Sequence, residues 1–453
     1  MARSSGVRGL LTPKRPRRPA AASLAFALML AGAPAAIARP GDVDRGFARG
    51  GAGVEFGADS SEAWAVALDQ FGRPVVGGSE AGGRLLVMRL MGNGRRDRRF
   101  GRNGLTTVTL PGLAPGGVRG LEVFRDGRIV LAATLESPDG SAPSRIALAR
   151  LLPDGELDPG FGDDGIAVVG PDGSHASALA LTHDGVIVVG GGVPAGEGDV
   201  PLVLRLAPDG TPDDSFDGDG AWSAAATPLR GWARAVLPLA DGSVAFAVGA
   251  TPGSAFPSAL VAARLTPAGA LDPGFGGGDG IAEVVLGPAV ARDGGAVGLV
   301  SGPAGRIVLA GTVAGPRSRA EGAVVRMLPD GSIDPGFGRA GVARLTARRG
   351  LRVAALARAR DGRLVVGGRS ASPKAAVVRL RANGRRDGTF GSDGVIVRAI
   401  GRPPAGRRTY SAVNALAIQR GGGVLTAGTV ADDNVLPGRR TGRRFLVLAR
   451  LRG

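Results

Sequence analysis

The chain is a succession of short apolar runs separated by turns rich in Gly, Pro, Asp and Asn. The runs within residues 177–185, 186–192 and 201–210 illustrate this pattern, since each ends at or beside a Gly-containing turn. Short apolar runs bounded by such turns are typical of β-strands. No segment after residue 38 has the apolar spacing of an amphipathic helix. The pattern therefore predicts an all-β protein.

The turns carry recurring signals of their own. Asp-Gly follows the first run of several repeats, beginning at Asp126, Asp184, Asp241 and Asp361. Asp-Gly and Asn-Gly supply the positive φ angles that two-residue hairpin turns require. A second signal is the hexapeptide LDPGFG, which occurs twice and returns once more as IDPGFG. Successive runs should therefore pair as antiparallel hairpins.

Looser relatives of this hexapeptide place a Phe three residues after an Asp throughout the chain. The recurring residues are Phe47, Phe100, Phe161, Phe216, Phe275, Phe337 and Phe390. They are separated by 53 to 62 residues, about 57 on average, with four apolar runs between neighbouring copies. Four-stranded units at such a period are typical of β-propellers. The sequence thus predicts seven four-stranded blades within residues 39–453.

The two ends of the chain distinguish a closed ring from an open solenoid of stacked repeats. The motif Asp44–Phe47 has no strands before it, and the final segment LARLRG ends after a third strand without a motif. An open solenoid needs atypical capping repeats, whereas a ring completes its last blade from the other terminus. We therefore predict a single seven-bladed propeller that is closed by pairing of the N- and C-terminal segments.

An Arg stands eight residues before each later motif Asp, at the end of the third run. The pairs are Arg89–Asp97, Arg150–Asp158, Arg205–Asp213, Arg264–Asp272, Arg326–Asp334 and Arg379–Asp387. A turn between the two positions brings them within cross-strand reach. Arg450 has no Asp downstream, so its predicted partner is Asp44. We interpret the pairs as partly buried structural ion pairs, because seven copies cannot all be one active site.

The unit RLxxDGxLDPGFGxxG, followed by ALAxxxDGxIVVGG, resembles the delta-60 repeat of exported bacterial proteins. The resemblance covers residues 42–453 and implies a propeller, and it brings no catalytic signature. Three copies depart from the pattern. Asp217 replaces the Gly after the Phe, Ala304 replaces an Asp, and the last repeat lacks that Asp as well. These departures concern individual turns and leave the predicted ring unchanged.

Residues 1–38 have the features of a signal peptide. Six Arg or Lys residues precede the apolar stretch AAASLAFALMLAGAPAA, and Ala36 to Ala38 match the small-residue cleavage pattern. An uncleaved N-terminal anchor is the alternative, but Gly32 and Pro34 interrupt the stretch, which is short for a bilayer span. No later segment has the apolar length of a transmembrane helix. We therefore expect a mature chain that is secreted or associated with the cell surface.

Charge is distributed unevenly along the chain, whose formal net charge is +17. Residues 339–453 hold 25 Arg or Lys against 5 Asp or Glu, a balance of +20, whereas residues 39–338 hold 25 against 34, a balance of −9. The last two blades should form a basic sector that attracts acidic glycans or cell-wall polymers. Few aromatic residues are interleaved, which disfavours nucleic acid. The candidate binding residues of the basic sector are Arg385, Arg386, Arg407, Arg408, Arg439, Arg440, Arg443 and Arg444.

Residue types that carry out catalysis or bind metals are sparse. The chain has no Cys, and its two histidines, His175 in a Gly/Ser-rich connector and His183 in an Asp-Gly turn, are interpreted as solvated turn residues. No P-loop, Gly-x-Ser-x-Gly elbow or His-rich metal spacing occurs. Asp213, Asp217 and Asp219 resemble a calcium loop without the full EF-hand spacing. We expect no cofactor, with calcium at these three residues as the alternative.

Two functions are compatible with these features. The first is an exported, non-enzymatic propeller that binds ligands or partners at its loops or surface. The second is a polysaccharide hydrolase or lyase whose carboxylates, distant in the sequence, gather near the ring axis. The chain has only three Trp and one Tyr, so aromatic platforms for sugars are scarce. We therefore expect a binding or scaffold module.

Overall fold

The chain divides after Ala38 into two units, residues 1–38 and 39–453, and the predicted signal peptide lies outside the described residues. Among the described residues, no helix is long and apolar enough to cross a membrane. The computed structural model describes residues 39–48, 54–56, 61–80, 84–110, 114–137, 140–196, 198–250, 255–256, 259–287, 291–292, 295–315, 319–345, 350–372, 374–399, 409–432 and 444–453.

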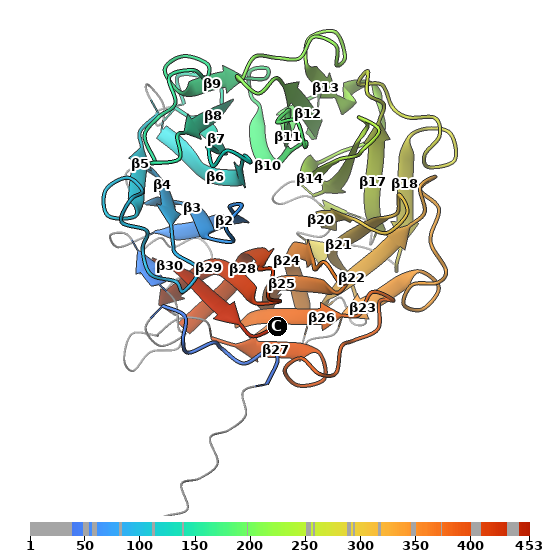
Figure 1. Cartoon of the computed structure of the whole chain (residues 1–453). Helices are drawn as coiled ribbons and strands as arrows, with labels where there is room; N and C mark the ends of the chain where they lie inside the picture. The colour runs from blue at the N-terminus through green and yellow to red at the C-terminus, as the bar shows by residue number, and fades with distance from the viewer. Residues whose placement is uncertain are drawn as a thin grey trace, which may run out of the picture. The chain divides into compact units, whose positions relative to one another are not determined.

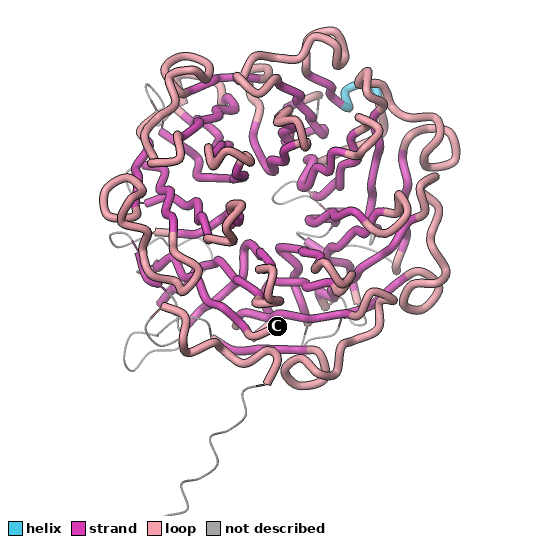
Figure 2. Tube along the Cα trace, in the orientation of Figure 1, coloured by secondary structure: helices cyan, strands magenta, loops and turns pink. Residues whose placement is uncertain are grey.

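Nearly all regular structure in the described residues is β-strand, as Figure 2 shows. The exception is the 3-10 helix η1 (Ala224–Ala226). The strands form antiparallel sheets, most of them with four strands that follow one another in the chain. The prediction of an all-β protein is therefore confirmed.

Four separate sheets keep the order of the chain. The first contains β2 (Glu62–Leu68), β3 (Pro74–Glu80), β4 (Arg84–Arg89) and β5 (Leu105–Val108). The second contains β6 (Ala114–Val123), β7 (Ile129–Glu136), β8 (Arg145–Leu151) and β9 (Ile166–Val169). The third contains β10 (His175–Leu181), β11 (Ile187–Pro194), β12 (Asp199–Leu206) and β13 (Ala221–Ser223). The fourth contains β24 (Leu351–Arg358), β25 (Leu364–Ser370), β26 (Ala375–Leu380) and β27 (Val395–Arg398).

Two further four-stranded runs are joined into one eight-stranded sheet by the single residue pair Gly249–Gly295. One run contains β14 (Trp232–Pro238), β15 (Val244–Gly249), β17 (Ala259–Leu265) and β18 (Ile281–Val285). The other contains β20 (Gly295–Ser301), β21 (Ile307–Ala314), β22 (Ala320–Met327) and β23 (Val342–Leu345). A small separate sheet pairs β16 (Ala255–Phe256) with β19 (Ala291–Arg292).

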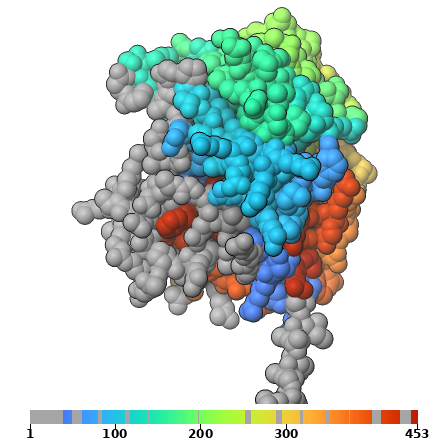
Figure 3. Space-filling model, turned by 60° about the vertical axis from the view of Figure 1, so that its left-hand side comes forward, coloured from blue at the N-terminus to red at the C-terminus, as the bar shows by residue number. Residues whose placement is uncertain are grey.

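The last sheet combines both ends of the described chain. Its order is β1 (Val54–Phe56), β30 (Arg444–Leu451), β29 (Val424–Asp432) and β28 (Thr409–Ile418). β1 pairs with β30 in antiparallel register, and Val43 forms an isolated bridge with Leu451. In Figure 3 the blue N-terminal residues accordingly lie beside red C-terminal ones. The N-terminal segment thus supplies the strand that the C-terminal segment lacks.

The sheets surround a central opening (Figure 1). The strands nearest to it are the first strands of the four-stranded runs: β2, β6, β10, β14, β20, β24 and β28. Apolar cores lie between neighbouring sheets. Val87 of β4 and Leu121 of β6 share one core, and Val324 of β22 and Leu351 of β24 share another. Strands beside these cores are buried on both faces, which explains their almost uniformly apolar sequences.

Glycines in the second strands reflect close approach of the first strands. A Cβ added at Gly78 of β3 would lie 2.3 Å from the carbonyl oxygen of Glu62. One added at Gly368 of β25 would lie 1.9 Å from the carbonyl oxygen of Arg352. Neither distance leaves room for a side chain, so the adjacent backbone requires Gly. The recurring VVGG sequences are therefore a consequence of how the first two strands of a sheet meet.

Candidate functional site

Two features that occur seven times among the described residues are candidates for a function: a cluster at the junctions between neighbouring sheets, and a set of side chains around the central opening. A junction cluster, as used here, consists of the strand-end Arg, its Asp partner and the Phe three residues after that Asp. The second feature was not predicted from the sequence.

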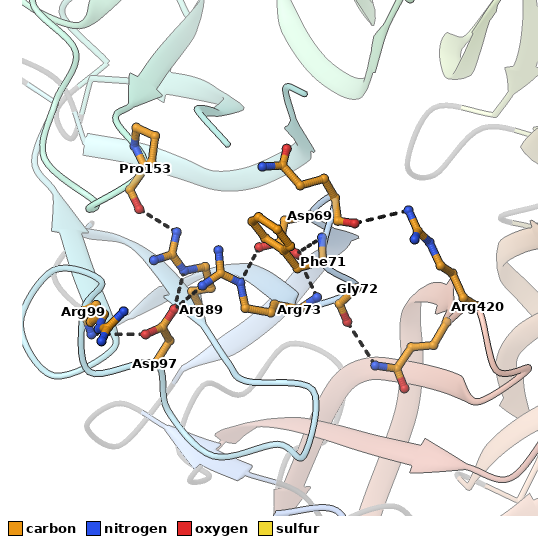
Figure 4. Close-up of polar contacts among 11 residues, drawn as sticks. Asp69, Phe71, Gly72, Arg73, Arg89, Asp97, Arg99, Pro153 and Arg420 are labelled. Carbon is orange, nitrogen blue, oxygen red and sulfur yellow. Dashed lines mark hydrogen bonds and ion pairs between the residues drawn. The ribbon is translucent and has the colours of Figure 1, made fainter. Parts of the chain in front are cut away.

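Figure 4 shows Arg89 and Asp97 of the junction cluster of the β2–β5 sheet. Arg89, the last residue of β4, donates from Nε to Oδ2 of Asp97 at 2.9 Å and from Nη1 to the carbonyl oxygen of Pro153 in the neighbouring sheet. Arg73 donates to the same carboxylate oxygen at 2.8 Å. The guanidinium carbon of Arg89 lies 4.7 Å from the centroid of the Phe100 ring. Arg89 and Asp97 are only 5% and 3% exposed, so this cluster is part of the core.

The same geometry recurs at every junction. The distances from Arg Nε to Asp Oδ2 are 2.6 to 2.9 Å, and the guanidinium carbons lie 4.4 to 5.0 Å from the Phe centroids. The pair between distant ends is present as predicted, since Arg450 Nε lies 2.8 Å from Oδ2 of Asp44. Phe47 beneath it is fully buried.

Hydrogen bonds lower the pKa of the junction carboxyl groups of Asp44 and Asp158. Burial acts to raise the pKa of Asp158, but the backbone N–H of Gly160 and the guanidinium of Arg150 outweigh it and lower the pKa. Burial also opposes the shift at Asp44, whose pKa is lowered mainly by its hydrogen bond from Arg450. Carboxylates stabilised in this way are weak bases. The junction clusters therefore serve packing, as the repeated spacing indicates.

The basic sector is described only in part. Arg385 and Arg386 lie in the turn after β26, where Arg385 is exposed and Arg386 is half-buried. Arg444 is the first residue of β30 and pairs with Ala431. The remaining candidates lie outside the described residues: Arg407, Arg408, Arg439, Arg440 and Arg443.

The acidic turn considered for calcium is tied into its surroundings by protein groups. Asp213 accepts hydrogen bonds from Arg205 at 2.7 Å and from the Ser215 hydroxyl at 2.6 Å. Asp219 accepts one from the backbone N–H of Ala221 at 2.8 Å. Burial and the neighbouring Asp219 carboxylate raise the pKa of Asp217. Within the described ranges, no group of three potential metal ligands comes together. Calcium binding here stays a prediction.

The two histidines differ from each other in position. His183 is an exposed turn residue, as expected. His175 is instead the first residue of β10, and the interpretation as a solvated turn residue is wrong for it. Its ring stacks on Trp232, with centroids 5.4 Å apart and planes 13° apart. β10 begins earlier than its apolar run suggested, because its first residues pair with β11 near the central opening.

A cavity of about 400 Å³ lies between the first strands of the runs. Each of these strands carries a β-bulge at the same place, which shifts its register with the second strand. A bulge turns an extra side chain out of the regular alternation. The bulge residues all line this axial cavity: Trp64, Arg119, Ser177, Arg234, Val297, Ala354 and Asn414.

Aromatic rings support the two bulge arginines. The guanidinium carbon of Arg119 lies 5.2 Å from the Trp64 ring centroid, and that of Arg234 lies 5.5 Å from the Trp232 ring centroid. Trp232 donates from Nε1 to Oδ2 of Asp199 at 2.8 Å, which fixes its ring. Such guanidinium–ring contacts orient the cations and stabilise them modestly. These contacts therefore hold the side chains of this part of the cavity in place before any ligand binds.

The axial cavity has a polar and an apolar side. Arg119, Ser177 and Arg234 come from the successive strands β6, β10 and β14, whereas Val297 and Ala354 come from β20 and β24. The Ser177 hydroxyl is buried and has no hydrogen-bond partner among the described residues. No described lining residue is an Asp or Glu, so the axial carboxylates expected for a hydrolase or lyase have no counterpart in this cavity.

Burial also affects the charge of Arg119. It lowers the pKa of the Arg119 guanidinium, while the nearby carboxylates of Glu136 and Glu62 act in the opposite direction. A cation in a poorly hydrated position interacts more strongly with an approaching anion than a cation on the open surface does. The polar side of the axial cavity is thus suited to negative charge.

The sequence also carries a recurring pattern at the bulge residues. When the first strands are superimposed, the bulge residue is followed each time by Ala or Gly and then by Val or Leu, as in WAV, RGL and NAL. Architecture determines the second and third positions. The bulge residue at the first position varies and includes Trp, Arg and Ala. The packing of the repeat therefore does not restrict this residue type.

Four segments match one family model, described as "Domain of unknown function (DUF5122) beta-propeller". The matched segments are residues 125–161, 183–216, 303–337 and 359–390. Each spans the turn after a first strand and continues to the Phe of the next motif. These matches support a family of β-propeller repeats. No curated protein matches the chain.

Several solved structures are similar to the chain at low sequence identity. Drosophila Semaphorin 2a is 10% identical, with a TM-score of 0.43 over 88% of this chain and 75% of that one. Sqt1 from Chaetomium thermophilum is 10% identical, with a TM-score of 0.43 over 89% of this chain and 99% of that one. BBS1N in complex with ARL6DN is 14% identical, with a TM-score of 0.42 over 89% of this chain and 94% of that one.

Proposed function

We propose that residues 39–453 form a closed propeller of seven four-stranded blades built from delta-60 repeats. The contacts of the N-terminal motif support closure on both of its sides. The Pro40 carbonyl accepts a hydrogen bond from Gly391 N–H at 2.9 Å, and Ala48 N–H donates to the Asn93 carbonyl at 3.0 Å. The first contact reaches the β24–β27 sheet and the second reaches the β2–β5 sheet. Residues 1–38 are proposed to direct export, so that the protein acts outside the cell or at its surface.

Within this architecture, the protein is proposed to be a non-enzymatic binding module whose ligand site is the axial cavity. The observation that carries this proposal is the bulge repeated in every first strand, whose seven side chains are of six types. A structural device would use one residue type, as the junction clusters do. Side chains of six types that converge on one cavity instead form an asymmetric, ligand-sized surface.

The basic sector is a second place where binding is proposed. Its high positive charge favours polyanions such as acidic glycans or cell-wall polymers. Arg385, exposed in the turn after β26, is the residue through which the described part of this surface is tested. Replacing Arg385 by Glu should weaken retention on an anionic polysaccharide matrix at low salt and leave the axial cavity unchanged.

The axial site is tested by filling it. Ala354 is exposed and lines the cavity, so Ala354→Trp reduces the free volume without removing a core side chain. A library of small molecules is screened for thermal stabilisation of the wild type and of Ala354→Trp, and the same library is assayed for turnover. Compounds that stabilise only the wild type support the proposal. Equal stabilisation of both proteins by every hit, or catalytic turnover of a hit, would show it to be wrong.

A further inference from the structure

The axial cavity also indicates which class of ligand it takes, an inference that rests on the proposed binding function. Its charged lining residues in the described part are Arg119 and Arg234, contributed by β6 and β14. Between these strands lies β10, whose bulge residue is Ser177 (Figure 1). Two guanidinium groups and a hydroxyl therefore line one side of the cavity from three successive strands.

The Ser177 hydroxyl on the polar side of the cavity lacks a hydrogen-bond partner within the described part of the chain. Its Oγ is buried and has no partner among the described residues, as is also the case for Ser174 and Thr266, whereas some neighbouring hydroxyls are engaged. The Thr134 hydroxyl, for example, accepts a hydrogen bond from the Ala176 N–H at 3.0 Å, one residue before Ser177. A buried hydroxyl without a partner destabilises a protein. A bound acceptor atom between Arg119 and Arg234 would remove this cost.

The opposite side of the cavity has a different character. Val297 of β20 and Ala354 of β24 occupy the corresponding bulge positions, and Leu299 and Leu356 lie two residues further along the same strands. These side chains offer no hydrogen bonds. They match the aliphatic or aromatic body of a ligand rather than a second charged group. A fully hydrated inorganic anion would leave this side without a contact.

Asn414 and Trp64 complete the polar side next to Arg119. Asn414 donates from Nδ2 to the Ala63 carbonyl at 2.8 Å and to the Thr429 hydroxyl at 3.2 Å, which leaves its side-chain carbonyl as an acceptor. Trp64 lies beneath the Arg119 guanidinium. Both residues hold the arginine side of the cavity in shape, and neither adds negative charge.

We propose that the axial cavity binds a small organic carboxylate, with the carboxylate between Arg119, Ser177 and Arg234 and the apolar body against Val297 and Ala354. Guanidinium groups suit carboxylates because they offer parallel N–H donors in one plane. A cavity of about 400 Å³ is at the lower end of the range found for small-molecule sites, which limits the ligand to a compact acid.

The experiment uses aliphatic and aromatic monocarboxylic acids, each compared with its primary amide and its amine, and inorganic phosphate as a separate arm. Binding to the purified protein is measured by isothermal titration calorimetry. Acids should bind, whereas their amides, their amines and phosphate should bind at least about tenfold more weakly, because hydrogen bonds to charged groups are the strong ones. Binding of amides or amines as tightly as acids, or binding of phosphate alone, would overturn the proposed ligand class.

Variants assign the roles of the residues. Arg119→Met and Arg234→Met should each weaken binding of an acid by about 10- to 100-fold. Arg98→Met, which removes an exposed Arg that neither lines the cavity nor belongs to the basic sector, is the matched control and should leave binding unchanged. Ala354→Glu supplies a carboxylate from within the protein and should abolish binding of acids. It keeps the proposal testable if an arginine variant does not fold.

The outcomes separate this inference from the proposed function. If Ala354→Trp blocks binding but the arginine variants leave it unchanged, the axial site exists and the carboxylate assignment is wrong. If Ala354→Trp, Ala354→Glu and the arginine variants all bind acids like the wild type, the site is elsewhere and the proposed function itself is wrong.

Discussion

The junction clusters and the bulge residues are both repeated around the molecule, yet they differ in one respect. Every junction cluster contains Arg, Asp and Phe with nearly the same geometry, whereas the seven bulge residues range from Ala and Val to Trp and Arg. Both positions are fixed by the backbone with comparable regularity. The comparison shows that regular backbone geometry alone does not dictate a residue type.

The physical difference lies in what surrounds each position. At a junction the Arg contacts a carboxylate, an aromatic face and, in most copies, a carbonyl oxygen of the neighbouring sheet, so any substitution leaves a buried partner unsatisfied. A bulge side chain projects into a cavity with space around it. Substitution there changes the cavity and leaves the packing between sheets intact.

Removing residues 39–48 should have the largest effect, because it eliminates the junction that joins the two ends. The deletion removes the buried Phe47 and leaves Arg450 without Asp44. Loss of a buried Phe costs about 3–5 kcal/mol, and an Arg stranded in a partly buried position adds to that. We expect the free energy of unfolding to fall by at least about 5 kcal/mol, near the whole stability of many domains. Urea denaturation followed by tryptophan fluorescence measures the change.

The same deletion removes the backbone partners of the last residues of β30, where Val43 bridges Leu451, and should promote aggregation through the exposed backbone. An unfolding transition identical to that of the intact chain would contradict the proposed closure, because the N-terminal motif would then contribute nothing to the ring.

Substitutions of single junction carboxylates should have the next largest effect on stability. The terminal and internal copies should lose similar amounts. Asp44→Ala and Asp158→Ala each leave a guanidinium without its carboxylate and should each cost on the order of 1–3 kcal/mol. Asp154→Ala is the matched control, since Asp154 is exposed and its carboxylate accepts a hydrogen bond from Glu156 N–H within its own turn. Thermal or urea unfolding of the three variants gives the comparison. A cost at Asp44 much smaller than at Asp158 would mean that the terminal junction is weaker than the internal ones.

These variants also predict a pH dependence. The pKa of Asp158 is lowered in the folded protein, so its contribution to stability is present above the unfolded value of 3.8 and is lost as the pH falls below it. The difference in stability between wild type and Asp158→Ala should therefore shrink on acidification. A difference that stays constant down to strongly acidic pH would contradict an ionic origin.

A substitution at Glu122 should change stability the least. Glu122 occupies a position that is apolar in the other first strands. It lies on β6, three residues after the bulge, where the other first strands have Ala67, Ala180, Leu237, Val300, Ala357 and Ala417. Burial raises the pKa of Glu122 to about 7. Folding therefore favours the protonated carboxyl, and stability should fall as the pH rises from about 4.5 through about 7.

Glu122→Gln should remove this dependence. At pH 8 it should stabilise the protein by about 2 kcal/mol, since each pKa unit corresponds to about 1.4 kcal/mol and partial exposure of Glu122 reduces the full effect. At pH 4 the variant and the wild type should be equally stable. Glu156→Gln, on an exposed turn, is the matched control. A variant that is less stable than wild type at pH 8 would show that the Glu122 carboxylate makes a stabilising contact.

The sequence by itself determined the repeat, the order of strands within it and the Arg–Asp pairs. These features are local: Asp-Gly turns fix hairpins, and a constant spacing of eight residues fixes the partners across a turn. Even the pair between Arg450 and Asp44 followed from counting, because Arg450 has no Asp eight residues after it and Asp44 has no Arg eight residues before it. The hydrophobic pattern did not reveal the start of β10, and it therefore misplaced His175.

Only the tertiary structure decided which strands face the centre and which side chains meet there. The second and third strands are largely buried on both faces, whereas first and fourth strands both mix buried with less buried residues, so alternation in the sequence does not distinguish the inner edge from the outer one. Arg119, Ser177 and Arg234 are about one repeat apart in the chain and meet because three sheets pack side by side. Their bulges depend on hydrogen bonding between strands, a property of the assembled sheet that no single segment encodes.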